Sequence, residues 1–152
     1  MISMETQVVE TRTAPTPVRA FLSFATADKP SVEAFKSRLG RQYPRVELLD
    51  HAVNDSYEED WKQACATKID RSELLICLIG PATHRSQAVA WEIHRGLSLG
   101  KRIVAVKLST DWVQVPEVLA RHAIQPRESI ADIDFASATT PAPKRGANDL
   151  FE

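Results

Sequence analysis

The apolar run at the centre of this chain reads SELLICLIG over residues 72–80, and AVAWEIHRG follows it at residues 88–96. Residues 74–79 are apolar without interruption, which is typical of a strand that is buried on both faces. A polar loop opened by Gly80 and Pro81 separates the two runs. The apolar spacing beyond it predicts a helix from about Ser86 to Leu99, ended by Gly100. The sequence therefore predicts a strand–loop–helix unit with its strand in the middle of a sheet.

Further strands are predicted on either side of this unit. They are residues 18–24, 46–50 and 102–108, with a short edge strand at residues 123–125. Helices are predicted around residues 31–39, from a capping box at residues 56–59, and more weakly at residues 116–120 and 129–135.

Strands that alternate with helices at this spacing predict an α/β fold with a parallel sheet. We expect a flavodoxin-like, three-layer domain with a central sheet of about five strands and helices on both faces. This domain is predicted to span residues 18–135, after a flexible leader at residues 1–17 and before a disordered tail at residues 136–152. The polar loops after the strands should share the carboxyl edge of the sheet, where such folds bind ligands.

The composition excludes several classes of protein. Hydrophobic residues make up 43% and charged residues 26% of the chain, as in soluble globular proteins. Its net charge of −1 argues against binding to nucleic acid by bulk charge. Two cysteines are too few for a disulfide framework or a four-ligand zinc site, and no metal site is predicted. With no apolar run of membrane-spanning length and no signal-peptide core, the sequence favours a cytoplasmic protein.

Glu92 is the residue that simple packing does not explain. On a helical wheel at about 100° per residue, it falls within the apolar arc that contains Val89, Ile93 and Gly96. A carboxylate there is costly unless another group pairs with it or solvates it. Two interpretations stay open at this point: an ordinary ion pair at the rim of the arc, or a functional carboxylate. The position of Glu92 near the start of a helix at the ligand-binding edge favours the second.

Trp91 points to the other side of the same helix. It could pack against a neighbouring element, such as the region of Trp112, or against a second subunit. We interpret it as part of an assembly surface.

Four pieces of the sequence together resemble a family. They are AFLSF at residues 20–24, IDRSELLICLIG at residues 69–80, WEI at residues 91–93 and GKRIVAV at residues 100–106. Their order and spacing are similar to those of TIR-like (Toll/interleukin receptor) domains, in the bacterial branch of the Thoeris antiphage-defence protein ThsB. The resemblance covers about residues 18–108.

The resemblance implies an immune signalling protein that cleaves the bond between nicotinamide and ribose in NAD. NAD would be a substrate, so no cofactor is expected. The products would be nicotinamide with ADP-ribose or a cyclic ADP-ribose signal, which a downstream effector could sense. The family's catalytic glutamate matches Glu92. Self-association or contact with other TIR domains is also implied.

The family's substrate pocket is walled by the loops after the first and second strands. The matching or bordering positions here are Ser23, Phe24, Ala25, Asp28, Asp50, Tyr57, Thr83 and His84. Phe24 or Tyr57 could stack on a ring of NAD, although core packing is an equal alternative for Phe24. Ser23 could contact a ribose or bond to the backbone.

Two alternatives remain. Residues 91–101 are also similar to nucleoside 2-deoxyribosyltransferases, in which a glutamate attacks the sugar of a nucleoside. A non-enzymatic TIR adaptor that uses Trp91 for assembly is the other.

Overall fold

The structure, a computed structural model, describes residues 18–50, 58–130, 133 and 135. Four parallel strands form one sheet in the order β2-β1-β3-β4. Their bounds are β1 (Val18–Ser23), β2 (Val46–Leu49), β3 (Leu74–Ile79) and β4 (Arg102–Lys107). Every residue of β3 is buried, as the unbroken apolar run predicted, because β1 and β4 flank it and helices cover both of its faces.

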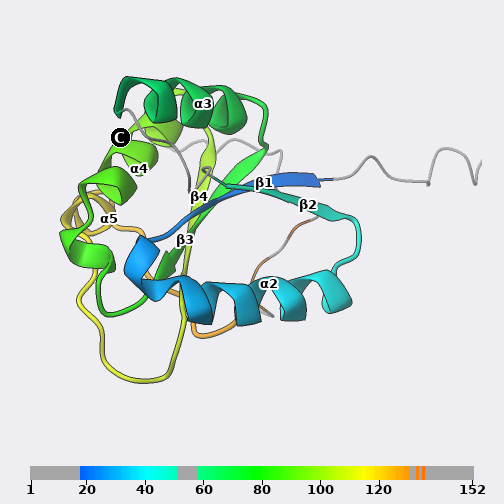
Figure 1. Cartoon of the computed structure of the whole chain (residues 1–152). Helices are drawn as coiled ribbons and strands as arrows, with labels where there is room; N and C mark the ends of the chain where they lie inside the picture. Colours follow the sequence, from blue (N-terminus) through cyan, green and yellow to red (C-terminus); the bar gives the residue numbers. More distant parts are fainter. Residues whose placement is uncertain (1–17, 51–57, 131–132, 134, 136–152) are drawn as a thin grey trace, which may run out of the picture.

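The helices form a layer on each face of the sheet (Figure 1). One face is covered by α2 (Lys29–Gln42). The other is covered by α3 (Glu58–Asp70), α4 (Gln87–Ser98) and the short α5 (Glu117–Arg121). Two single turns, η1 (Thr26–Asp28) and η2 (Thr83–Arg85), follow β1 and β3. The predicted three-layer α/β fold is therefore confirmed.

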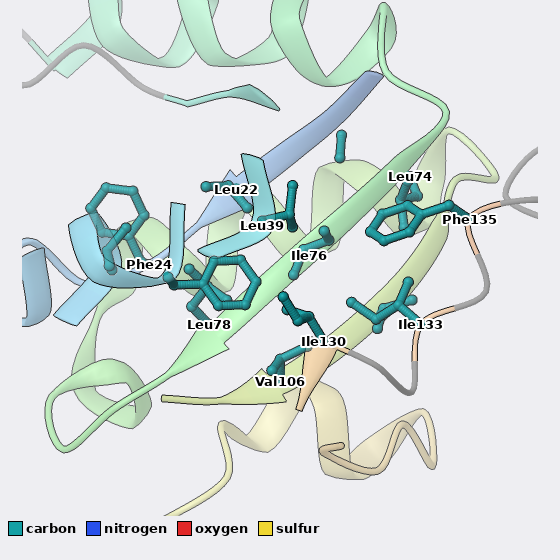
Figure 2. Packing of buried hydrophobic residues seen from close by; sticks show 14 residues of the cluster. Leu22, Phe24, Leu39, Leu74, Ile76, Leu78, Val106, Ile130, Ile133 and Phe135 are labelled. Atoms are coloured by element: carbon teal, nitrogen blue, oxygen red, sulfur yellow. The ribbon is translucent and has the colours of Figure 1, made fainter. Parts of the chain in front are cut away.

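Each layer has its own core cluster. On the α2 side, Val32, Phe35 and Leu39 pack against alternate residues of the strands. Figure 2 shows this cluster, to which Ile130, Ile133 and Phe135 also contribute. On the other side, apolar residues of α3, α4 and α5 pack against the intervening strand residues. Successive side chains of a strand point to opposite faces, so the two clusters divide each strand between them.

The end of the described chain differs from the prediction. Residues 123–125 are not a strand, since Ala123 has a φ of +57°, which extended backbone cannot have. The chain instead meets β4 at Arg127, whose N–H and C=O pair with Ala105 and Lys107. Among the described residues this bridge stands in place of a fifth strand. In the predicted helix at residues 129–135, the described positions Ile130 and Phe135 have 3-10 geometry, and the N–H of Ile133 is bonded to the C=O of Ile130 at 3.0 Å. Ile130, Ile133 and Phe135 serve as core residues.

The helix that carries Glu92 follows the prediction closely. Ser86 is its N-cap, and its Oγ accepts the N–H of Val89 at 3.1 Å. After the last turn, Gly100 adopts a φ of +74°, a left-handed conformation suited to glycine. The start of α3 is confirmed only from Glu58, because the predicted cap Ser56 lies outside the described residues.

The strand order places the ligand-binding edge between β1 and β3. From β1 the chain moves outward to β2 through α2, and from β2 it crosses back past β1 to β3 through α3. The helices that follow β1 and β3 therefore lie on opposite faces of the sheet, and the carboxyl ends of these two strands form the edge at which such folds bind ligands. Ser23 and Gly80 stand at this point.

Candidate active site around Glu92

Glu92 is fully buried, with 0% of its surface exposed, on the face of α4 that packs against the sheet. Its Oε1 accepts a hydrogen bond from Oγ of Ser23 at 2.6 Å, and its Oε2 accepts one from Sγ of Cys65 at 3.5 Å. Hydrogen bonds of this kind offset part of the cost of burying a carboxylate. The wheel thus placed Glu92 correctly on the packing side of its helix, and the bond to Ser23 fixes its carboxylate at the end of β1.

Ser23 reaches Glu92 because it ends β1 on the α4 side of the sheet. In the register of β1 and β3, Ser23 lies beside Cys77. Burial, and next the negative charge of Glu92, raise the pKa of the Cys77 thiol far above its ordinary value. Because the thiolate is the nucleophilic form of cysteine, Cys77 is not suited to attack a substrate. The carboxylate of Glu92 is therefore the candidate functional group of this cluster.

A second buried cluster ties the loop after β1 to the loop after β3. Asp28, 8% exposed, accepts a hydrogen bond from Oγ1 of Thr83 at 3.1 Å. The same Oγ1 accepts the N–H of Gly80 at 2.8 Å. Gly80 has no Cβ, and one placed there would lie only 2.6 Å from Cγ of Asp28. The predicted residues Asp28 and Thr83 thus meet each other at this junction, whereas Ser23 meets Glu92.

Asp50 follows β2 and is held by two lysines. Its carboxylate lies 3.0 Å from Nζ of Lys36 in α2, and its backbone oxygen accepts a bond from Nζ of Lys68 in α3 at 2.6 Å. Burial alone would lower the pKa of Lys36, but Asp50 and then Glu33 raise it above the ordinary value. In this structure Asp50 joins α2, β2 and α3, which is a structural role.

The remaining predicted residues divide between core, surface and undescribed chain. Phe24 is 3% exposed and packs in the α2-side core (Figure 2), so its ring is not placed to stack on a ligand beside Glu92. Ala25 is also buried. His84 lies in η2 and lines a hollow on the other side of α4. Tyr57 lies outside the described residues.

Trp91 packs within the chain. Its ring meets that of Trp61 in α3 edge-on, with centroids 5.5 Å apart and an interplanar angle of 77°. Nζ of Lys62 lies 6.0 Å from the centroid of Trp91. The neighbour of Trp91 is thus α3 and not the region of Trp112, which is 82% exposed. A role of Trp91 in assembly stays a prediction.

Sequence reasoning missed the two cysteines beside Glu92. The cysteine count argues against a disulfide framework but predicts no role for Cys65 and Cys77, which are both buried and form no disulfide. One signal was available for Cys65, because it belongs to the apolar face of its helix, four residues before Ile69. That face had to meet the same core as Glu92. Among the described His, Cys, Asp and Glu side chains, no group of three or more could hold a metal ion.

Comparison with known proteins places this geometry in a family. Residues 21–112, more than half of the chain, match the family model of the Thoeris protein ThsB, TIR-like domain. This chain belongs to that family. The match begins within β1, contains Ser23, Cys65, Cys77 and Glu92, and ends in the loop after β4.

Solved structures agree on the fold. The chain is similar to the TIR domain of the Toll-related receptor TRR-2 from Hydra magnipapillata, with a TM-score of 0.55 and 14% identity over 74% of this chain and 84% of that one. It is also similar to the CMP N-glycosidase BcmB from Clostridium botulinum, with a TM-score of 0.50 and 17% identity over 72% of this chain and 87% of that one. No curated protein sequence is similar enough to count as a relative.

The family supports a role of this TIR-like domain in immune signalling, within Thoeris antiphage defence. In the described part of the chain, no helix combines the length and apolar character needed to cross a bilayer.

Proposed function

We propose that this protein cleaves the nicotinamide–ribose bond of NAD, with Glu92 as the catalytic carboxylate. The observation that carries the proposal is the buried Glu92 side chain, held by Ser23 at the carboxyl end of the central strands. Two further facts support it. The chain belongs to the ThsB TIR-like family, and one structural neighbour of the same fold is named as an N-glycosidase.

The reaction requires from the protein mainly a negative charge placed close to the ribose. When the N-glycosidic bond breaks, its electron pair moves to the positively charged ring nitrogen, so nicotinamide leaves as a neutral molecule without an acid. Positive charge then develops on the ribose, as in other glycosidic cleavages, and a nearby carboxylate stabilises it. A water oxygen bonds to the anomeric carbon and its proton passes to solvent, or a nitrogen of the adenine attacks and gives a cyclic product.

The burial of Glu92 adds a requirement. Its carboxylate has no exposed surface, so a ribose reaches it only when the side chains around it move. We propose that self-association, or contact with another TIR domain, produces this change, and that a downstream effector senses the product. The protein would act in the cytoplasm, where NAD is available.

The test is to incubate dilute and concentrated protein with NAD and to follow nicotinamide by chromatography. We expect release that rises faster than protein concentration and falls at least about a hundredfold in Glu92→Gln. Glu47→Gln is the matched control, because Glu47 is an exposed residue of β2. A rate that Glu92→Gln leaves intact would refute the assignment of this residue.

Two other substrates decide between the alternatives. Base exchange between deoxynucleosides, lost in Glu92→Gln, would favour a deoxyribosyltransferase-like enzyme. Release of cytosine from CMP would indicate that the substrate is CMP, which is the substrate in the name of the structural neighbour. No turnover of any of them at high concentration would favour the adaptor.

A further inference from the structure

The carboxylate of Glu92 is held from two sides by side chains of two different elements. Oγ of Ser23, at the end of β1, lies 2.6 Å from Oε1, and Sγ of Cys65, within α3, lies 3.5 Å from Oε2. All three residues are 0% exposed. A thiol is a weaker donor than a hydroxyl, so the two bonds differ in strength. Each oxygen of the carboxylate thus accepts a bond from a different part of the fold.

The bond to Ser23 is not enough to fix the orientation of this carboxylate. The last torsion of a glutamate side chain has no sharp minimum, so a carboxylate held through one oxygen can still rotate about the bond to its methylene group. A donor at the second oxygen restricts this rotation. The thiol of Cys65 occupies that position, and as a neutral donor it leaves the negative charge of Glu92 in place.

The packing of α3 against α4 sets the position of Cys65. The two helices lie on the same face of the sheet (Figure 1). One turn before Cys65, the ring of Trp61 meets that of Trp91 edge-on, with centroids 5.5 Å apart. One turn after it, Ile69 is buried in the same core cluster. The thiol is therefore supported on both sides along its helix, as a preorganised functional group requires.

We propose that Cys65 is a positioning residue for Glu92 in the cleavage of the nicotinamide–ribose bond. This inference rests on the proposed function. The thiol contacts the carboxylate and not the reacting atoms, so it acts by holding the carboxylate where its charge faces the ribose as positive charge develops there. Packing alone explains a small side chain at position 65, but it does not explain one that donates to Oε2 of Glu92.

The kinetic test compares Cys65→Ala, which removes the donor, with Cys65→Ser, which restores one. With NAD as substrate, we expect Cys65→Ala to lower kcat by about tenfold, the effect of one hydrogen bond to a charged group, and to leave KM unchanged. Cys65→Ser should recover most of the natural kcat. Ile69→Val is the matched control, because it removes a methylene group from the same buried face of α3 and leaves the donor in place. It should leave kcat unchanged.

Infrared spectroscopy tests the contact without NAD. The S–H stretch lies apart from the other bands of a protein, and it moves to lower frequency when the thiol donates to a carboxylate. Cys65→Ala identifies the band of Cys65 by removing it and leaves that of Cys77. We expect Glu92→Gln to move the Cys65 band to higher frequency, because a neutral amide oxygen is a weaker acceptor than a carboxylate. Ile69→Val should leave the band unchanged.

The positioning role of Cys65 is wrong if Cys65→Ala and Ile69→Val change kcat equally, or if Cys65→Ser is no more active than Cys65→Ala. It is also wrong if the Cys65 band does not respond to Glu92→Gln. Failure of NAD cleavage itself gives a different result, in which the natural chain releases no nicotinamide although the band still moves in Glu92→Gln. That result would overturn the proposed function, together with the role of Cys65 in it.

Discussion

Oγ of Ser23 and Oε1 of Glu92 are 2.6 Å apart, although 69 positions separate the two residues in the chain. The bond joins the end of β1 to the middle of α4, so it serves the fold and the site together. A hydroxyl that donates to a buried carboxylate reduces the cost of the charge and holds the carboxylate in one orientation. The same side chain therefore contributes to stability and positions the group that we propose to act on ribose.

Ser23→Ala should lower the free energy of unfolding by about 1–3 kcal/mol, because it leaves a buried carboxylate oxygen without its donor. Urea denaturation measures the change. Ser37→Ala is the matched control: Ser37 is an exposed residue within α2, where alanine should be neutral or slightly stabilising. Equal losses in the two variants would mean that the bond to Glu92 contributes no stability.

Some properties of Glu92 and Phe24 could be predicted from the sequence alone, and others could not. The burial of Glu92 followed from helical periodicity, since its neighbours at helical spacing are apolar. The sequence did not predict which face of the sheet the Phe24 side chain points to, because β1 is covered on both faces and its apolar residues fit either face. Strand alternation sets Ser23 and Phe24 on opposite faces, but only the packing of α2 and α4 decides which face holds the site.

At the scale of elements, the loops after β1 and β3 are joined through Asp28, Gly80 and Thr83. The carboxylate of Asp28 packs where a Cβ of residue 80 would stand. This close approach explains why glycine follows β3, and it links η1 to η2. The junction therefore holds together the segments that follow β1 and β3, the strands of which β1 ends in Ser23.

Gly80→Ala should be destabilising by about 1–3 kcal/mol, the usual cost of overpacking, because the new Cβ would lie within 2.9 Å of three carboxyl atoms of Asp28. Gly40→Ala is the same chemical change, but its expected effect on stability is the opposite. Nothing lies within 4 Å of a Cβ at position 40 in α2, so alanine should stabilise that helix by about 0.5–1 kcal/mol. Thermal unfolding of both variants measures the difference.

A double variant tests the cause. If the Asp28 carboxylate is the obstacle, Gly80→Ala should cost clearly less in an Asp28→Ala background than in the natural chain. An unchanged cost would place the clash elsewhere.

The elements that sequence predicted well are those with strong periodicity or clear caps. The helix α4 was predicted within a residue because Ser86 and Gly100 mark its ends. The predicted strand at residues 123–125 failed for a reason that periodicity cannot reveal. Ala123 takes a left-handed conformation after α5, and the chain pairs with β4 only at Arg127. A three-residue apolar segment carries too little pattern to distinguish these outcomes.

At the scale of the whole molecule, Trp91 could serve packing within the chain, assembly of two copies, or both. Its edge-on contact with Trp61 joins α4 to α3, yet both rings are only partly buried. The contact itself predicts that Trp61→Ala and Trp91→Ala each lower stability and that their effects are not additive. The coupling energy of such an aromatic pair is about 0.5–1.5 kcal/mol, which a double-mutant cycle in urea measures.

Assembly requires a gentler substitution that keeps the core intact. Trp91→Phe retains an aromatic ring against α3, and Trp61→Phe makes the matched change on the other side of the contact. If the outer part of Trp91 joins two copies of the domain, sedimentation velocity over a range of concentrations should show weaker self-association for Trp91→Phe than for Trp61→Phe. Trp112→Ala tests whether Trp112 joins two copies instead. That side chain is 82% exposed, so its loss should leave the unfolding temperature unchanged. If only Trp112→Ala causes dissociation, the assembly surface is the loop between β4 and α5 and not α4. In that case Trp112→Ala should also change how nicotinamide release depends on protein concentration.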